Sequence, residues 1–527
     1  MKKKMIFLLC MCIALTALAG CVGNKKISTS AAIEYNGDKI YPLQCEDTLT
    51  YWMALNVDLS QTYENFGDAP IGKQLEKNTG IKVTYVHPQQ GQGNEQLNIL
   101  IASNDLPDIV QHNWLDYPGG PDFAINEGTV YALNDYIEEF APNLYNYMSK
   151  NPDIDKALKT DAGNYYSVPS IRGEDWLCCY MGMAIRGDWL EQSGLSEPKT
   201  ISEFEALMEK FKKFAKAEPL YFTPANRSYI MNAYEIGNEY YIDDSGKVKY
   251  GPAEPEYKEV LTTLNRWYNN DILHKDAISN AAKVKSTILN GESGAFFGAV
   301  VSGIGKMLSA KPEEIKEFSI IPIVQVSKNG EDVPEFSYME DNIIHSVGTA
   351  ISTNCQNIEL ALRWLDYGFT EEGHMLNNFG IEGVSYNMVD GEPKLSDTIL
   401  NNPDGLSLNK VAPLYLRAAY SGAFVQDSRY VEQSLVYPQQ IDAYKKWSNT
   451  NMKKHIIPSI TLLSEELDKA SDIQANISTY VDEMFIKFVT GRESIENFDS
   501  YINQLEKFGL SEILKMKQNA LIRYNKR

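Results

Sequence analysis

The sequence lacks the short motifs that identify most enzymes. Its 527 residues contain no Gly-x-Ser-x-Gly nucleophile motif, no phosphate-binding P-loop and no His-Glu-x-x-His zinc motif. The segment Gly291-Glu292-Ser293-Gly294 has the wrong spacing for a nucleophile motif, and Gly91-Gln92-Gly93 lacks the third glycine of a dinucleotide-binding loop. We therefore expect no enzyme. Carboxylates are plentiful, however, and they leave one alternative open, a surface glycoside hydrolase that uses two of them as acid and base.

Cysteine is also scarce. Seven cysteines occur, and the four that follow the first 21 residues fit neither a disulfide framework nor a paired metal site: Cys45, Cys178, Cys179 and Cys355. The adjacent pair lies in the hydrophobic stretch WLCCYMGMAI, which favours two buried thiols over a redox pair. The segment Asp243-Asp244-Ser245-Gly246-Lys247 lacks the alternating ligands and the final glutamate of an EF-hand calcium loop. We predict a surface turn there, no bound metal and no cofactor.

Basic residues are fewer than acidic ones. Asp and Glu total 70 against 49 for Lys and Arg, so the formal net charge is −21. Such a chain is repelled by nucleic acids and anionic lipid surfaces, which argues against nucleic-acid binding and against a body that lies flat on a membrane. The 43% of hydrophobic residues and 11% of aromatic residues supply substantial cores. A chain of this length is expected to form roughly two to four domains.

Only one long hydrophobic run is present, at the beginning of the chain. Three lysines precede residues 5–18 (MIFLLCMCIALTAL), which are fewer than the about 20 residues needed to span a bilayer. The run ends in Leu18-Ala19-Gly20-Cys21, which resembles the bacterial lipobox. This resemblance implies that residues 1–20 are a signal peptide, that Cys21 carries a lipid, and that residues 21–44 form a flexible tether. An ordinary signal peptide that happens to contain a cysteine is the alternative.

The order of predicted elements after the tether indicates a parallel sheet. Strand-like segments alternate with helical ones at residues 48–55, 66–79, 81–85, 94–103 and 107–111. This β-α-β-α-β order is typical of a doubly wound α/β sheet. Ligands bind such sheets beyond the carboxyl ends of the strands, which directs attention to the loops at residues 52–56 and 111–116.

A second region begins near residue 166, and the C-terminal third of the chain is helix-rich. Thr200 and Glu203 form a capping-box pattern, and apolar residues then recur at helical spacing to Phe214. Residues 255–270 repeat this pattern, and a further helix is predicted over residues 358–373. We predict that the aromatic residues on these apolar helix faces are buried in the hydrophobic core.

Aromatic residues outside those stripes indicate the kind of ligand. They are Trp52, Trp114, Trp176, Tyr221 and the pair Phe296-Phe297, all expected in loops. An aromatic ring covers the apolar C–H face of a sugar, while amide and carboxylate groups bind its hydroxyls. Trp114 is the strongest candidate because Asn113 and Asp116 lie beside it at the end of a predicted strand.

Several segments, in this order behind a lipobox, resemble one protein family. They are residues 102–110 (ASNDLPDIV), 163–169 (GNYYSVP), 185–190 (IRGDWL), 195–204, 291–297 (GESGAFF), 359–373 and 380–386 (GIEGVSY). The family is extracellular solute-binding protein family 1, the lipoprotein substrate-binding component of a carbohydrate ABC transporter. The resemblance runs through most of the chain after the tether.

This resemblance implies a two-lobe α/β fold of the type II periplasmic-binding-protein kind, with interlaced lobes joined by a hinge. The first lobe would hold residues 45–169 and 347–397, and the second residues 170–346 and 398–527. The implied protein is a monomer that closes on a carbohydrate ligand, docks on ABC permease subunits and breaks no bond. It would be lipid-anchored on the extracellular face of the cytoplasmic membrane of a Gram-positive bacterium, with no other membrane contact.

The resemblance also places residues on the cleft between the lobes. The implied ligand-binding set is Trp52, Asn56, Asn113, Trp114 and Asp116 on the first lobe, Trp176, Tyr221 and Phe297 on the second, and Glu382 and Tyr386 returning from the first. Some oligosaccharide binders of this kind carry an acidic calcium loop, which this sequence does not have. A peptide or another polar solute as ligand, and a purely structural or sensory surface lipoprotein, remain alternatives.

Overall fold

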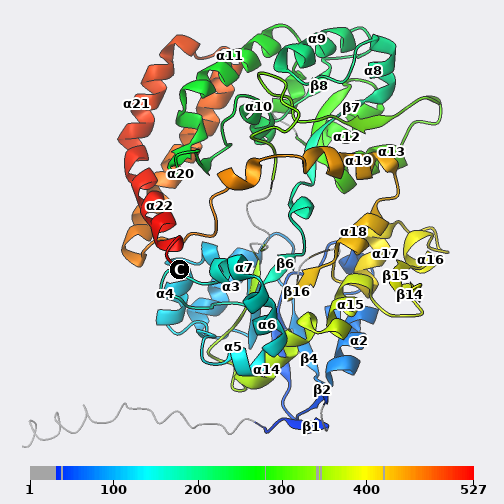
Figure 1. Cartoon of the computed structure of the whole chain (residues 1–527), viewed down its shortest axis with the longest axis vertical. Helices are drawn as coiled ribbons and strands as arrows, with labels where there is room; N and C mark the ends of the chain where they lie inside the picture. The colour runs from blue at the N-terminus through cyan, green and yellow to red at the C-terminus, as the bar shows by residue number, and fades with distance from the viewer. Residues whose placement is uncertain are drawn as a thin grey trace, which may run out of the picture.

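The structure, a computed structural model, describes residues 31–527 except 37–38, 279–280, 340–343, 345–346, 419 and 421. Figure 1 shows two lobes, one above the other in this view, with the first strands of the chain at the far end of the lower lobe. The predicted signal peptide and Cys21 lie outside the described residues. Among the residues described, every helix is too short or too polar to cross a membrane.

The first lobe is built on a four-stranded sheet in the order β13-β5-β3-β4. Its strands are β3 (Leu49–Trp52), β4 (Val83–Val86), β5 (Ile109–His112) and β13 (Gly348–Ile351). β3 pairs in parallel with both β4 and β5, and β13 runs antiparallel to β5. The predicted β-α-β-α-β order is therefore confirmed, with α2 (Pro70–Thr79) and α3 (Gly93–Ser103) as the connecting helices.

Further elements complete this lobe. They are β1 (Glu34–Asn36), β2 (Lys39–Gln44), α4 (Gly120–Asn126), α5 (Ile137–Phe140), α6 (Pro142–Lys150), α7 (Pro152–Leu158), α14 (Ile358–Asp366) and α15 (Glu371–Phe379). The last two form separate helices joined by a 3-10 turn, where one helix was predicted. α2 ends at Gly80, as predicted, in the left-handed conformation (φ 77°), and a Cβ there would lie 2.3 Å from the carbonyl oxygen of Leu43. Only glycine fits this position.

The second lobe has its own four-stranded sheet, in the order β12-β7-β11-β8. Its strands are β7 (Met181–Arg186), β8 (Leu220–Tyr221), β11 (Ala295–Ala299) and β12 (Ile320–Pro322), and a separate hairpin is formed by β9 (Tyr240–Ile242) and β10 (Val248–Tyr250). β7 is antiparallel to both β11 and β12, whereas β8 and β11 are parallel. The first three of the five residues of β11 and five of the six in β7 are buried, as expected of central strands.

Helices of this lobe follow the predicted periodicity. They are α8 (Gly187–Ser193), α9 (Ile201–Phe211), α10 (Arg227–Ala233), α11 (Pro255–Asn269), α12 (Val284–Leu289) and α13 (Lys306–Ser309). The capping box is confirmed, because the Thr200 side chain accepts from the Glu203 N–H and the Glu203 carboxylate accepts from the Thr200 N–H. The apolar stripe of α11 is buried in the core, as its spacing predicts.

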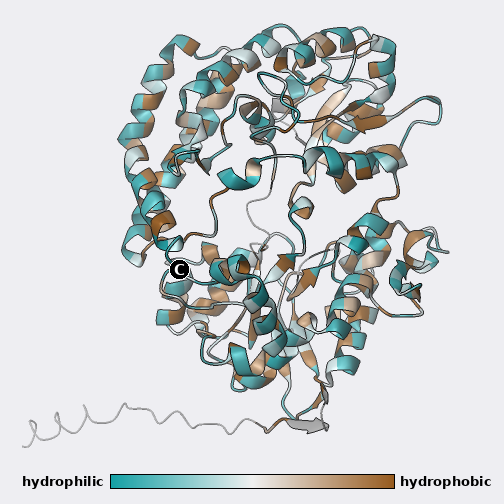
Figure 2. Ribbon diagram, in the orientation of Figure 1, coloured by the Kyte–Doolittle hydropathy of each residue, from teal (hydrophilic) through white to brown (hydrophobic). Residues whose placement is uncertain are grey.

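Three C-terminal helices lie along one side of the second lobe and reach the near end of the first lobe (Figure 1). They are α20 (Ser464–Val489), α21 (Phe498–Phe508) and α22 (Leu510–Tyr524). Teal and brown residues alternate along these helices in Figure 2, as expected of helices with one buried face. α20 packs against α11 of the second lobe and also contacts α4 of the first, so this helical layer touches both lobes.

The hinge between the lobes contains a pair of short parallel strands, β6 (Ser170–Arg172) and β16 (Phe424–Gln426). β6 leads the chain from the first lobe into β7 of the second. The chain returns from β12 of the second lobe to β13 of the first, and it crosses again to the second lobe after β16. The lobes are therefore interlaced, as the family resemblance implies.

The contacts of residues 398–447 bear on where the last crossing between the lobes lies. Residues after 397 were assigned to the second lobe, yet α17 (Leu408–Tyr415) packs against α2, and α18 (Ser428–Ser434) packs against β15 (Glu392–Leu395), the partner of β14 (Tyr386–Val389). The short helix α16 (Asp397–Leu400) packs against β15 as well. In contrast, α19 (Pro438–Trp447) packs against β7 and β12 of the second lobe. We therefore propose that the boundary lies between α18 and α19.

Candidate functional site

The hinge strands open onto a hollow. Gly173 follows β6, and its N–H donates to the carbonyl of Gln426 at the end of β16 (3.1 Å). A Cβ on Gly173 would lie 2.3 Å from that same oxygen, so the close approach of the two strand ends requires glycine. The chain then turns through Glu174 into a short 3-10 helix, Asp175–Cys178, which faces the hollow.

This hollow has a volume of about 590 Å³. It is lined by Gly173, Glu174, Asp175, Trp176, Cys179, Met339, Ser448, Thr450 and Lys453. The lining comes from three parts of the chain: the segment after β6, the segment that returns toward β13, and the segment after α19. The first two lead across the hinge. A ligand here would touch the connections that must bend when the lobes move relative to each other.

Trp176 is the aromatic wall of the hollow. Its ring is partly exposed and meets Tyr444 of α19 edge to face, with centroids 4.8 Å apart. The indole N–H donates to Glu174 (2.7 Å), which fixes the orientation of the ring. A ring held in this way on a concave polar surface can stack on the C–H face of a sugar without paying side-chain entropy on binding.

Glu174 joins the two sides of the hinge. One carboxylate oxygen accepts from the indole of Trp176, and the other accepts from the hydroxyl of Ser428, at the start of α18 (2.6 Å). Ser428 belongs to the first-lobe side of the hinge and Trp176 leads into the second. A single carboxylate therefore connects the lobes at the edge of the hollow.

The remaining polar groups of the hollow are charged or hydroxylic. Lys453 donates to the carboxylate of Asp175 (2.5 Å), and the side chains of Ser448 and Thr450 line the same wall. Carboxylate, ammonium and hydroxyl groups can together satisfy both the donors and the acceptors of a polyhydroxylated ligand. Cys179 is a poor nucleophile because burial raises the pKa of its thiol to about 12.

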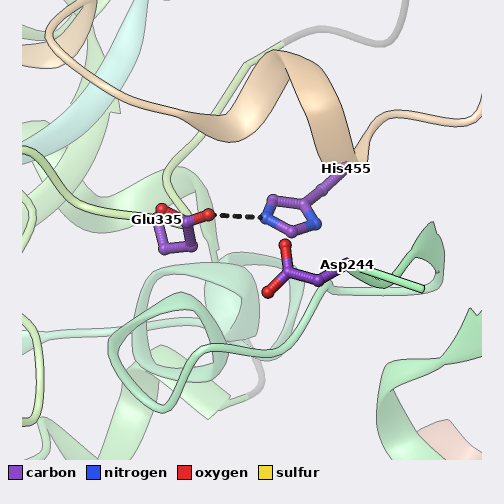
Figure 3. Close-up of side chains that lie close together, drawn as sticks. All are labelled: Asp244, Glu335 and His455. Atoms are coloured by element: carbon purple, nitrogen blue, oxygen red, sulfur yellow. Dashed lines mark hydrogen bonds and ion pairs between the residues drawn. The ribbon is translucent and has the colours of Figure 1, made fainter. Parts of the chain in front are cut away.

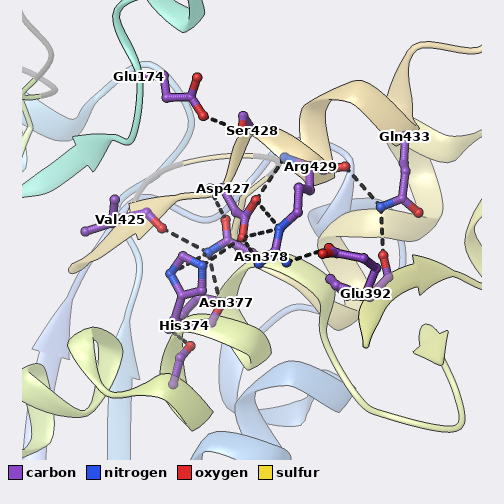
Figure 4. Close-up of polar contacts among 12 residues, drawn as sticks. Glu174, His374, Asn377, Asn378, Glu392, Val425, Asp427, Ser428, Arg429 and Gln433 are labelled. Atoms are coloured by element: carbon purple, nitrogen blue, oxygen red, sulfur yellow. Dashed lines mark hydrogen bonds and ion pairs between the residues drawn. The ribbon is translucent and has the colours of Figure 1, made fainter. Parts of the chain in front are cut away.

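A polar network holds the end of β16 in place (Figure 4). Asp427 follows that strand, and its carboxylate binds His374 of α15 (2.9 Å) and the guanidinium of Arg429 (2.7 Å). These partners hold the pKa of Asp427 well below its usual range, despite partial burial. Asn378 donates to the carbonyl of Val425 (2.9 Å) and accepts from the Asp427 N–H (2.8 Å). The network positions Ser428, and through it Glu174.

Of the aromatic residues predicted to bind ligand, one lies in this hollow and the others are buried. Trp176 lines the hollow, whereas Trp52, Trp114, Tyr221 and Phe297 are 4%, 1%, 1% and 7% exposed. The expectation that they lie in loops was wrong for three of them, because Trp52 lies in β3, Tyr221 in β8 and Phe297 in β11. A role for these four in ligand binding stays a prediction.

Trp114 lies in a turn but is buried all the same. The turn is a short 3-10 helix, Trp114–Asp116, directly after β5. Its ring nevertheless packs among Leu97, Val110 and Tyr117, with the Tyr117 ring centroid 5.9 Å away. α3 and α4 cover this end of the sheet and remove the indole from solvent.

The predicted polar residues of the first lobe shape turns. The side chain of Asn56 accepts from the N–H groups of Asp58 and Leu59, and that of Asn113 accepts from the Leu115 N–H. Asn113 also donates to the exposed carboxylate of Asp116 (2.7 Å). These bonds are local, so any contact with a ligand by Asn56, Asn113 or Asp116 remains a prediction.

Glu382 and Tyr386 lie together elsewhere. Both line a second hollow of about 770 Å³ on the first lobe, between α2 and α15. Glu382 is exposed, and Tyr386 is 6% exposed with its pKa raised by burial. The structure therefore does not bring the ten predicted residues into one site.

Sequence reasoning missed the polar partners of Trp176. Glu174 and Asp175 precede it directly, and two adjacent acids beside an aromatic residue outside a core stripe were a usable signal. Lys453 had no comparable signal, since it reaches Asp175 across 278 positions of sequence. The predicted burial of Cys178 and Cys179 is confirmed, and so is the surface turn after Asp243.

Comparison with known proteins supports one family. The family model described as bacterial extracellular solute-binding protein matches residues 61–375. The fructooligosaccharide ABC transporter substrate-binding protein FusA of Streptococcus pneumoniae is 25% identical, over 97% of this chain and 96% of its own. The polygalacturonan/rhamnogalacturonan-binding protein YtcQ of Bacillus subtilis is 23% identical, over 85% of this chain and 87% of its own.

A solved structure agrees on the fold. Alginate-binding protein AlgQ2, in a crystal structure without calcium ion, superposes with a TM-score of 0.71 at 23% identity, over 90% of this chain and 98% of its own. The type II two-lobe architecture expected from the sequence is thus shown. The chain belongs to the bacterial extracellular solute-binding proteins.

Proposed function

We propose that this protein is the substrate-binding component of an ABC importer and captures an oligosaccharide in the hollow at the hinge. The observation that carries this proposal is Trp176, a partly exposed indole hydrogen-bonded to Glu174 in a hollow of about 590 Å³ that polar and apolar side chains line together. The proteins named above are described as binders of fructooligosaccharide, polygalacturonan/rhamnogalacturonan and alginate. Their diversity supports a sugar as ligand and leaves the particular sugar open.

Transport by such a protein requires two conformations. A ligand that contacts the connections on both sides of the hinge binds the closed arrangement better than the open one, and so shifts the population toward closure. Glu174 is suited to this role, because it joins Trp176 to Ser428 across the hinge. The closed monomer then docks on the permease subunits, and no bond of the ligand is broken.

The proposed location follows from the beginning of the sequence. The lipobox-like residues Leu18-Ala19-Gly20-Cys21 support cleavage and lipidation at Cys21, on the extracellular face of the cytoplasmic membrane. Family membership supports the extracellular location. Metabolic labelling with a tagged fatty acid tests the anchor: Cys21→Ala should abolish the label, and a label that persists would contradict it.

Equilibrium titration tests the function. Fructooligosaccharides, oligogalacturonides, alginate oligosaccharides and neutral glucans are titrated into the protein without its signal peptide, with calorimetry and thermal unfolding as readouts. Binding at 100 times Kd should stabilise the protein by about 2.7 kcal/mol. Binding of at least one glycan, reduced in Trp176→Ala and with no product formed, supports the proposal. Sustained turnover of a glycan, or no response to any of them, contradicts it.

A further inference from the structure

Three side chains from distant parts of the second lobe converge outside the hollow (Figure 3). Asp244 lies in the turn between β9 and β10, Glu335 in the segment after β12, and His455 at the end of a 3-10 helix, Met452–His455. One ligand atom of each lies within 4.8 Å of the others. This combination of an imidazole and two carboxylates is a common donor set for divalent transition metals.

His455 is held as a metal-binding histidine is held. Its side chain is 3% exposed and stacks on Phe336, with ring centroids 4.2 Å apart. Its Nδ1 lies 2.7 Å from the carbonyl oxygen of Ile242, which can only accept, so Nδ1 carries a proton. The other ring N–H of a metal-binding histidine is typically bound to a carbonyl or carboxylate in this way.

The second ring nitrogen of His455 faces negative charge. Nε2 lies 3.2 Å from Oε1 of Glu335. With the proton on Nδ1, a neutral ring directs the lone pair of Nε2 at a carboxylate oxygen, and two acceptors at this distance repel each other. A positive charge between or beside these two atoms relieves the repulsion, and a bound metal ion is one way to supply it.

At present the side chain of Lys454 supplies a positive charge to this cluster. Its ammonium pairs with Glu335 and lies 3.3 Å from Asp244. The Lys454 side chain is 51% exposed and the Asp244 side chain 80% exposed, so both can move at little cost. A long, exposed lysine is a replaceable counter-ion for the two carboxylates, whereas His455 is fixed.

The neighbouring acid does not belong to this cluster. Asp243 accepts from the N–H and hydroxyl of Ser245 and from the N–H of Lys247, and these bonds close the turn. The turn therefore presents Asp244 alone toward Glu335 and His455. This arrangement differs from a calcium loop, in which successive acids of one segment share an ion.

We propose that Asp244, Glu335 and His455 form a binding site for a divalent transition metal such as Zn²⁺, which exchanges with the ammonium of Lys454. The three side chains would leave one position of a tetrahedral ion open to water. The ion would join the β9–β10 turn, the segment after β12 and the segment after α19. That last segment also carries Lys453, so metal binding would restrain one wall of the hollow.

Zinc titration of the untagged protein tests this proposal. Zn²⁺ is titrated in competition with a chromophoric chelator, and Ca²⁺ and Mg²⁺ are titrated as hard-ion controls. Lys454→Gln, which removes the competing cation, should bind Zn²⁺ about three- to fivefold more tightly than the wild type, as expected from the strength of a surface ion pair. Asp244→Asn should bind it about tenfold or more weakly. Asp332→Asn, an exposed acid that pairs with Lys199 elsewhere, should change nothing.

A spectroscopic readout separates this site from the cysteines. Cobalt(II) bound at nitrogen and oxygen gives no thiolate charge-transfer band. We therefore expect the cobalt-loaded wild type to show no such band, and a thiolate band would contradict the proposal. Equal zinc affinity in the wild type, Lys454→Gln and Asp244→Asn also contradicts it. So does a lack of zinc binding by both the wild type and Lys454→Gln, which would leave the cluster as an ion pair between Lys454 and the two carboxylates.

Discussion

Asp161 of the first lobe forms an ion pair with Arg527 at the end of the C-terminal helical layer, with 2.5 Å between Oδ1 and Nη2. Arg523 of α22 binds the other carboxylate oxygen of Asp161. The side chains of Asp161 and Arg527 are 9% and 6% exposed. Two guanidinium groups from the layer that packs on the second lobe thus share one buried carboxylate of the first lobe, away from the hinge strands.

We predict that Asp161→Asn destabilises the protein by about 3 kcal/mol, because it leaves two arginines without their carboxylate in a buried contact. Urea unfolding monitored by circular dichroism measures this change. X-ray scattering of the folded variant should also show a larger radius of gyration than the wild type, since a contact between the lobes is lost. An unchanged midpoint and an unchanged scattering curve would show that the pair does not hold the lobes. Asp332→Asn, in an exposed pair, serves as the control.

A change in pH should act on the first lobe through His87. Its Nδ1 donates to the carbonyl of Met53 (2.8 Å) and its Nε2 accepts from the N–H of Phe66 (3.1 Å). Burial lowers the pKa of His87 below its ordinary value of 6.5. The unfolded chain therefore binds this proton more readily, and the contribution to stability is complete above about pH 6.5 and is lost as the pH falls below it.

Urea unfolding at pH 7.5, 6.5 and 5.5 measures this dependence. The wild type should lose stability toward the lowest pH. His87→Gln should lose less over the same interval, although not nothing, because burial also lowers the pKa of His112. An identical slope in both proteins would show that His87 does not titrate in this interval.

Two tryptophans that the sequence treats alike should behave differently when truncated. Trp176→Ala should weaken oligosaccharide binding by tenfold or more (about 1.4 kcal/mol) with a small loss of stability, because the ring is partly exposed in the hollow. Trp114→Ala should destabilise the fold by about 3–5 kcal/mol, since its ring is 1% exposed. Calorimetric titration and denaturant unfolding of both variants make the comparison. Normal stability in Trp114→Ala together with lost binding would reverse the two assignments.

Gly173 should tolerate no side chain. In Gly173→Ala the new methyl group would lie 2.3 Å from the carbonyl oxygen of Gln426, so β6 and β16 must separate at their ends. We expect weaker ligand binding and a lower melting temperature. Gly163→Ala is the control for an added methyl group, because that glycine precedes the hinge and has open space around its Cβ position, although its φ of 85° adds local strain. Wild-type binding by Gly173→Ala would exclude a tight strand contact at the hinge.

Local patterns in the sequence predicted the elements that depend on neighbouring residues. The capping box at Thr200, the buried face of α11 and the parallel order of β3, β4 and β5 all follow from spacing within short windows. The single helix expected over residues 358–373 failed for a local reason as well, because the chain passes through a 3-10 turn at Tyr367–Phe369 and restarts at the Thr370 cap.

The sequence by itself determined the family resemblance and the type of sheet in the first lobe. Tertiary structure alone decided which tryptophan faces a hollow. Trp114 and Trp176 both lie in short turns after a strand. Residues of α3 and α4 bury the ring of Trp114, whereas Trp176 meets Tyr444 of α19 at the edge of a hollow and stays partly exposed. The polar partners were decided in the same way, since Glu174 meets Ser428 across 254 positions and Asp175 meets Lys453 across 278. Burial and pairing depend on which distant segments meet, and no window of sequence contains that information.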